Sequence, residues 1–252
     1  MDITFRHKSV VKVLAIAVFF FCGLSQTSGA SVDYGDFSGT MVDFSGVNET
    51  TNSIGDPPAL FETPIHKEGW DQLLFFPSAF SAASSGPDSD TTTGTLRMTI
   101  TAKSGTPIER VIIEEFGDYS MTGASGTAEA KFNGTLLVTP TSGPPIPAID
   151  YQGDVFTFPG DSAGPFSSRW EADLTALGFP VFEAELTFDN LLQASSALGT
   201  DAFIQKKLTN GPAIRLSVNN DPVVPVPAAI WLLGSGLLGI WPIAKRRRWH
   251  TQ

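Results

Sequence analysis

Apolar and polar residues alternate with a period of two in the central part of the chain. Leu96, Met98 and Ile100 alternate with polar residues between positions 95 and 101. Two further segments show the same alternation, with apolar positions Trp170, Ala172 and Leu174, and Phe182, Ala184, Leu186 and Phe188. Because successive side chains of a strand point to opposite faces, each segment is predicted to be a β-strand with one buried and one solvated face.

Shorter apolar runs, separated by Gly- and Pro-rich breakers, predict further strands. They lie at 41–47, 73–76, 108–116, 132–139, 155–158, 202–208 and 214–218. About ten short strands and almost no helical pattern predict an all-β fold, an antiparallel β-sandwich that is jelly-roll-like. The only helix candidate is 190–198, for which a loop is an equal alternative.

The alternation also predicts which side chains form the core. These residues are Leu96, Met98, Ile100, Ile112, Trp170, Leu174, Phe182, Leu186 and Phe188. A register slip by one residue would turn every one of them to the other face, so their burial tests the assignment directly.

The N-terminal segment has the features of a secretory signal peptide. Arg6, Lys8 and Lys12 precede or interrupt an apolar stretch at 10–24, and Ser28 and Ala30 are small residues at the −3 and −1 positions of a cleavage site. We therefore expect a signal helix within 1–30 that is cut after Ala30, with an uncleaved anchor as the alternative. The only cysteine, Cys22, lies in the apolar stretch and would be lost.

A second apolar segment lies near the C-terminus. Residues 228–244 carry no charge, and as a helix this 17-residue span would reach about 25 Å, the lower end of what crosses a bilayer core. Four cations follow it: Lys245, Arg246, Arg247 and Arg248. A basic cluster marks the cytoplasmic side, so this stop-transfer signal predicts a transmembrane helix with its C-terminus inside. A simple membrane anchor is one interpretation.

The order of these C-terminal parts resembles a known class of sorting signals. A proline motif precedes the apolar span and consists of Val224, Pro225, Val226, Pro227 and Ala228. The segment from 224 to 248 resembles the PEP-CTERM class of bacterial sorting signals, in particular its VPLPA-CTERM variant, with Val226 in place of Leu. This resemblance implies a Gram-negative source, processing by an exosortase and association with exopolysaccharide. It also implies a stay in the inner membrane before processing and delivery to the cell surface or extracellular matrix.

The chain therefore divides into a signal peptide at 1–30, an exported β-sandwich domain at 31–222 and a sorting signal at 223–252. The two ends hold seven of the 16 basic residues but only one of the 26 acidic ones, so the central domain is strongly acidic. Nucleic-acid binding requires a basic footprint, which makes a nucleic-acid partner unexpected. An acidic surface instead suits solubility, divalent cations or neutral sugars.

Candidate chemistry in the central domain is sparse. Asp88 and Asp90 follow a Gly-Pro turn, and alternating carboxylates in a loop can wrap calcium. A solvated loop is the alternative, and no other cofactor is expected. Glu114 and Glu115 are neighbours on a predicted strand, so they face opposite sides and are expected near solvent at the strand end.

No catalytic constellation is evident, so the protein is not expected to be an enzyme. His66 is the only histidine between the two ends, so it is the only possible base of a Ser-His-Asp triad. Trp70 and Tyr151 lie beside polar turns, where they either anchor the core or form a platform for a glycan. The favoured interpretation is a non-enzymatic surface or matrix protein. The alternatives are a carbohydrate-binding or carbohydrate-active domain, and a permanently anchored periplasmic protein.

Overall fold

The computed structural model describes residues 30–51, 53, 56, 59–66, 70–103, 105–144 and 146–219. Within these residues the chain forms thirteen β-strands and one 3-10 helix, η1 (Thr175–Leu177). The strands are β1 (Ala30–Ser38), β2 (Val42–Thr51), β3 (Ile65–His66), β4 (Gln72–Phe75), β5 (Ser81–Ser85), β6 (Asp88–Ala102), β7 (Arg110–Gly123), β8 (Ala128–Pro140), β9 (Ile149–Phe158), β10 (Ala163–Asp173), β11 (Glu183–Ser196), β12 (Thr200–Lys206) and β13 (Ile214–Val218).

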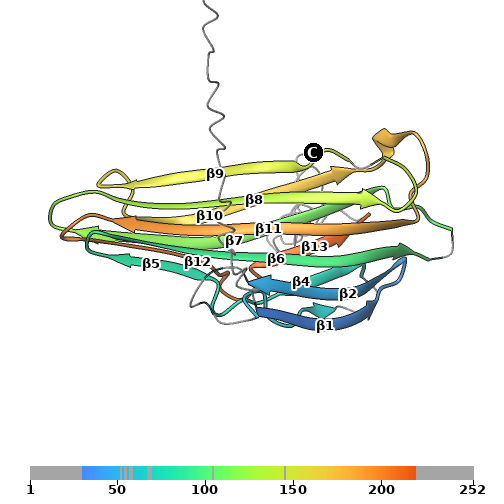
Figure 1. Ribbon diagram of the computed structural model, residues 1–252, viewed down its shortest axis with the longest axis horizontal. Helices are drawn as coiled ribbons and strands as arrows, with labels where there is room; N and C mark the ends of the chain where they lie inside the picture. Colours follow the sequence, from blue (N-terminus) through green and yellow to red (C-terminus); the bar gives the residue numbers. More distant parts are fainter. Residues whose placement is uncertain are drawn as a thin grey trace, which may run out of the picture.

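The strands form two antiparallel sheets that pack face to face (Figure 1). Sheet A has the order β1-β2-β6-β11-β8-β9. Sheet B contains β3, β4, β5, β7, β10, β12 and β13, with β7 paired to β10 on one edge and to β12 and β13 on the other. The prediction of an all-β antiparallel sandwich is therefore confirmed.

At two positions across sheet B, a pair of strands lies end to end and together fills one row of the sheet. β12 pairs with Gly117–Gly123 of β7 and β13 pairs with the segment 111–115 of the same strand, so the two lie end to end. In the neighbouring row β5 pairs with β12 and β4 pairs with β13. The chain leaves the sheet between β12 and β13 and returns to the same row at Ile214.

Apolar side chains from both sheets fill the space between them. The largest fully buried residues include Trp170, Phe44, Phe61, Phe75, Phe80, Phe132 and Phe188. Trp170 and Phe188 come from opposite sheets, and their rings meet edge to face with centroids 5.0 Å apart. This edge-to-face contact packs the two sheets against each other.

Most of the predicted core is confirmed. Buried residues are Leu96, Met98, Ile100, Ile112, Trp170, Leu174, Leu186 and Phe188, although Ile112 lies outside the hydrophobic cluster between the sheets. Phe182 was predicted to be buried and this is wrong: it precedes the first residue of β11 and is 44% exposed. The helix or loop expected at 190–198 is also wrong, because residues 190–196 continue β11 and pair with β6 and β8.

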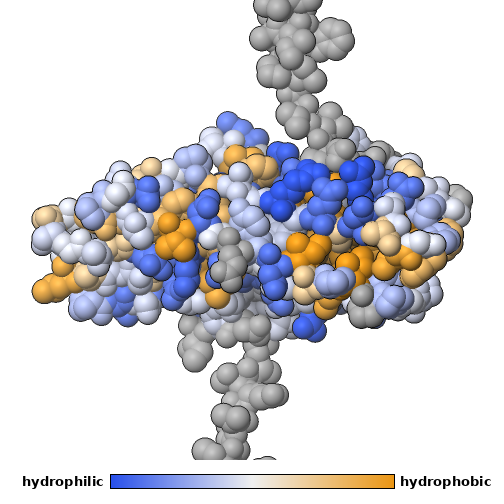
Figure 2. Space-filling model, turned by 90° about the horizontal axis from the view of Figure 1, so that it is seen from above, coloured by the Kyte–Doolittle hydropathy of each residue, from blue (hydrophilic) through white to orange (hydrophobic). Residues whose placement is uncertain are grey.

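Seen from the side of β9 and β10, apolar residues on the surface lie in separate patches between polar ones (Figure 2). Among the described residues, no helix is both long and apolar enough to cross a membrane. Ser28, the proline motif at 224–228 and the basic cluster at 245–248 lie outside the described residues, so the predictions for them stay predictions. The same holds for the predicted signal helix and C-terminal helix.

Candidate functional site

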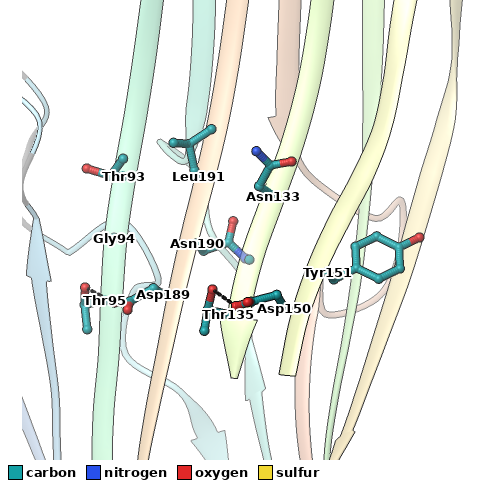
Figure 3. A pocket seen from close by; sticks show the side chains of 11 residues that line it. Thr93, Gly94, Thr95, Asn133, Thr135, Asp150, Tyr151, Asp189, Asn190 and Leu191 are labelled. Carbon is teal, nitrogen blue, oxygen red and sulfur yellow. Dashed lines mark hydrogen bonds between the residues drawn. The ribbon is translucent and has the colours of Figure 1, made fainter. Parts of the chain in front are cut away.

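The candidate site is a groove on the outer face of sheet A. It has a volume of about 540 Å³, within the range of small-ligand sites. Four neighbouring strands, β6, β11, β8 and β9, contribute its lining (Figure 3). The lining residues are Thr93, Gly94, Thr95, Asn133, Gly134, Thr135, Asp150, Tyr151, Asp189, Asn190 and Leu191.

A row of hydroxyl and carboxylate side chains crosses the groove. Strand register places Thr95, Asp189, Thr135 and Asp150 side by side on four adjacent strands. Thr95 Oγ1 donates a hydrogen bond of 2.5 Å to Asp189 Oδ1, and Thr135 Oγ1 donates one of 2.8 Å to Asp150 Oδ1 (Figure 3). Each threonine thus orients the neighbouring carboxylate through Oδ1. The Oδ2 atom of that aspartate is left for a ligand.

Two glycines beside Asn190 let the strands approach the core closely. Gly94 and Gly134 are the register partners of Asn190 on β6 and β8. A Cβ at Gly94 would lie 2.9 Å from Phe61 Cε2, and one at Gly134 would lie 2.7 Å from Trp170 Cζ2. The core aromatics therefore occupy the space that side chains would need, and the centre of the groove is lined by backbone.

Tyr151 connects the groove to the core. Its ring is half-buried, 5.3 Å from Trp170 and 5.8 Å from Phe132 between centroids. Tyr151 thus packs on the core and also lines the groove, and its role as a platform for a glycan stays a prediction.

The charge of the groove restricts its ligands. Asp150 and Asp189 are its only charged lining residues, and no Lys or Arg is among them. Two carboxylates without a cation disfavour anionic ligands, whereas hydroxyl, amide and carboxylate groups together suit a neutral polyhydroxylated ligand. The lining also holds no His, Cys or Ser side chain.

The structure places Asp88 and Asp90 differently from the expectation. They lie within the first three residues of β6, where it pairs with β11, rather than in a loop, and the Asp88 carbonyl accepts a hydrogen bond of 2.8 Å from Ser84 Oγ. Asp90 Oδ2 accepts a hydrogen bond of 2.8 Å from Ala83 N, and Asp88 Oδ1 accepts one of 2.8 Å from Ser89 N. No cluster of three or more His, Cys, Asp or Glu side chains in the described residues is arranged to share a metal ion. Calcium binding by these residues stays a prediction.

The other sequence candidates lie apart in structure. His66 is on β3, with Nε2 3.2 Å from the carbonyl oxygen of Trp70. Glu114 points outward and pairs with Arg169, 3.3 Å between Oε1 and Nη1. Glu115 was expected near solvent and this is wrong: it is fully buried between the sheets.

The sequence pattern alone does not single out Thr95, Thr135, Asp150 or Asp189 as site residues. Thr95 and Thr135 lie within predicted strands, whereas Asp150 and Asp189 lie outside them, and only strand pairing brings the four side chains into one row.

Comparisons with known proteins identify no family. The sequence matches no family model and no curated protein. Among solved structures, similar folds include the enzymatically active domain of bacteriophage CBA120 tailspike protein 4 (11% identity, TM-score 0.20, 77% of this chain and 19% of that one). Infectious bursal disease virus, Gx strain, is also similar (12% identity, TM-score 0.24, 82% and 60%). So is the family 11 carbohydrate-binding module from Clostridium thermocellum (11% identity, TM-score 0.16, 67% and 95%).

The chain spans 19% of the length of the first of these structures and 60% of the second, which is less than two thirds of either. At these TM-scores the likenesses carry no argument about activity.

Proposed function

We propose that this is an exported, non-enzymatic protein of the bacterial cell surface or extracellular matrix. The observation that carries the proposal is the order of its parts: a signal peptide, an acidic domain, a proline motif, an uncharged span and a basic stop. A signal helix directs export, a C-terminal helix holds the chain in the inner membrane, and an exosortase then processes it at the motif. The released protein associates with exopolysaccharide or the cell envelope.

The fold of the central domain supports an extracellular role. Within the two larger sheets, β5-β12-β7-β10 and β6-β11-β8-β9 are four-stranded parts, and the chain passes from one to the other at each step except from β8 to β9. This strand order supports the assignment of a jelly roll. Jelly rolls are common among viral capsid and lectin domains. The strand order therefore supports a domain that acts by presenting a surface.

Processing is tested by locating the chain in a Gram-negative host with and without an exosortase. With the enzyme, we expect surface material that lacks residues 237–248 by peptide mass spectrometry. The double variant Pro225→Ala, Pro227→Ala should stay in the inner membrane, while the control Pro242→Ala, outside the motif, should be processed. Recovery of an intact 237–248 peptide from surface material would contradict processing. Equal membrane retention with and without exosortase would indicate a permanent periplasmic anchor.

A second candidate function is binding of a neutral polysaccharide in the groove of sheet A. The row of Thr95, Asp189, Thr135 and Asp150 favours it, because paired hydroxyl and carboxylate groups are the usual hydrogen-bonding partners of sugar hydroxyls. Tyr151 adds an aromatic edge beside that row. Such binding would explain how a released protein stays within exopolysaccharide.

The glycan proposal is tested by affinity electrophoresis in gels that contain neutral or acidic polysaccharides. We expect retardation by a neutral polymer and loss of that retardation in the variant Asp150→Asn, Asp189→Asn. The matched control is Asp201→Asn, since Asp201 accepts hydrogen bonds from Ser85 and Thr122 hydroxyls at 2.6 and 3.2 Å on sheet B. Equal retardation of both variants would place binding outside the groove, and no retardation by any neutral polymer would remove this candidate function.

A further inference from the structure

A charged cluster lies in the middle of the hydrophobic core. Glu115 of β7 points between the sheets and is fully buried, Lys206 of β12 is 1% exposed, and Asn190 of β11 is 3% exposed. Lys206 Nζ donates to Glu115 Oε2, and Asn190 Nδ2 donates to Glu115 Oε1. One carboxylate therefore bridges a lysine on sheet B and an asparagine on sheet A.

The surroundings of the cluster are buried and largely aromatic. The Lys206 ammonium lies 5.6 Å from the ring centroid of Phe80 and 5.9 Å from that of Phe166. Ser168 adds one further hydroxyl, 3.4 Å from Glu115 Oε2. Burial lowers the pKa of Lys206, although the charge of Glu115 opposes this shift. A buried ion pair is weak support for stability, because both charges lose their hydration.

The asparagine in this cluster is incompletely bonded. Asn190 Oδ1 is buried and has no hydrogen-bond partner in the described structure, and the same is true of Trp170 Nε1. Trp170 packs against Gly134, the register partner of Asn190. Unpaired buried polar atoms are rare in proteins, and each one calls for an explanation such as chemistry at the site.

We propose that Lys206 and Asn190 form an intramolecular amide bond, with Glu115 as the proton-transfer group. The three residues supply everything that the reaction needs: an amine nucleophile, a carboxamide electrophile and a carboxylate that contacts both. No oxidant, metal or cofactor enters. The proposal does not depend on sorting or on glycan binding.

The step begins with transfer of one ammonium proton from Lys206 Nζ to Glu115, which leaves a neutral amine with a lone pair. The neutral carboxyl group can then donate to Asn190 Oδ1, the atom that has no partner, and so polarise Cγ. Removal of water from the site keeps the amine from being protonated again by solvent.

Nζ then attacks Asn190 Cγ, and a C–N bond forms. A second proton passes from Nζ through Glu115 to Nδ2, the Cγ–Nδ2 bond breaks, and ammonia leaves. The third original proton stays on the new amide nitrogen, and Glu115 ends protonated. The ammonium and carboxylate charges have cancelled, and one ammonia is released for each bond.

The product would join the two sheets covalently. Asn190 is in sheet A and Lys206 in sheet B, so the bond would cross the core from one sheet to the other. The chain has one cysteine, Cys22, within the predicted signal peptide, so a disulfide within the central domain has no residues to form it. An amide bond also resists the redox conditions that break disulfides.

The first test is the mass of the full-length protein. The bond predicts a mass that is lower than the sequence mass by one ammonia, about 17 Da. Trypsin should fail to cut after the acylated Lys206 and should release 170–207, since no other Lys or Arg lies between Arg169 and Lys206. In that peptide the mass deficit should lie within 190–206, and backbone cleavage inside this ring should release no fragment. A chain of full sequence mass that is cut after Lys206 would overturn the proposal.

Variants identify the residues that form the amide bond. We expect Lys206→Arg, Asn190→Ala and Glu115→Gln each to have the full mass of their sequence, whereas Lys103→Arg, a change at a surface ion pair, should retain the deficit. Loss of ammonia at Asn133-Gly134 or Asn210-Gly211 by succinimide formation has the same mass, so peptide mapping must place the deficit. A deficit mapped to either Asn-Gly site, or one that persists in Asn190→Ala, would equally overturn the proposal.

Discussion

At the scale of single residues, adjacent glutamates on β7 occupy opposite environments. Glu114 is partly exposed and pairs with Arg169, whereas Glu115 is fully buried and contacts Lys206 and Asn190. Removal of one partner of a buried ion pair leaves the other charge unpaired, which is far more destabilising than loss of a surface pair.

We therefore expect Glu115→Ala to lower the free energy of unfolding by about 3–5 kcal/mol. Glu114→Ala should lower it by less than about 1 kcal/mol, because its ion pair is solvated. Urea denaturation of both variants measures the difference. Similar losses in the two would mean that the assignment of faces on β7 is wrong.

A second residue-scale prediction concerns Tyr34. Burial, together with the hydrogen bond of 2.5 Å that its hydroxyl donates to Glu49, raises the pKa of Tyr34 above its usual range. Because the unfolded chain releases this proton near pH 10 and the folded chain retains it, stability is fully present below about pH 10 and falls as the pH rises further.

Denaturation between about pH 9 and pH 11 should show this fall, and it should be smaller in Tyr34→Phe. The variant also loses a hydrogen bond, so the comparison rests on the slope with pH and not on absolute stability. An unchanged slope in Tyr34→Phe would exclude Tyr34 as the group responsible.

Phe182 and Phe188 show how far alternation identifies buried residues. Both belong to one period-two pattern in the sequence, but Phe188 is fully buried and Phe182 is 44% exposed. Phe188→Ala should cost about 3–5 kcal/mol of stability, since it leaves a cavity beside Trp170 and Phe61. Phe182→Ala should change stability by less than about 0.5 kcal/mol. Thermal denaturation of the pair tests this, and a larger loss for Phe182→Ala would reverse the assignment.

The buried cluster was not predicted from the sequence, although its positions follow the pattern. Lys206 continues the inward series of Ala202 and Ile204, and Asn190 lies between the inward residues Phe188 and Leu192. A polar residue at such a position usually marks the end of a strand or a solvated face. Only the pairing of distant strands shows that the lysine, the asparagine and Glu115 compensate one another.

At the scale of elements, strand centres were predicted better than strand ends. The predicted strand at 214–218 coincides with β13, and 41–47 and 73–76 overlap β2 and β4. β6 is much longer than predicted, because its first residues, Asp88 to Thr93, also pair with β11. This segment is entirely polar, so it shows no apolar alternation. β1, β3 and β5 were missed, as they are short or rich in polar and small residues.

The start of β6 also bears on calcium. Asp88 and Asp90 lie two residues apart on one strand, so their side chains share a face. If calcium binds there, a saturating concentration should raise the melting temperature of the parent but not of Asp88→Asn, Asp90→Asn. At a hundred times the dissociation constant the gain is about 2.7 kcal/mol. Asparagine keeps a hydrogen-bond acceptor for Ala83 N. A difference in the calcium response of the parent and this variant would therefore be due to the lost charges. No shift in the parent would remove calcium from this site.

At the scale of the whole molecule, the sandwich was predictable and its pairings were not. Alternation within a strand reports that one face is buried, as Leu96, Met98 and Ile100 show. It carries no information on which strand lies alongside, and β11 pairs with β6 and β8 across separations that local patterns do not reach. The groove is a product of that pairing, which is why its residues were found only in the structure.

The position of β13 determines how the molecule bears mechanical load. This strand lies between β4 and β7 inside sheet B, and not at an edge. Tension applied beyond Asn219 would run along the strand axis, so the hydrogen bonds on both sides of β13 would share the force in shear. An edge strand such as β1 is bonded on one side only, to β2, so the same tension along it would be borne by a single row of hydrogen bonds. A domain tethered through its C-terminal end would thus be held at its mechanically stronger end.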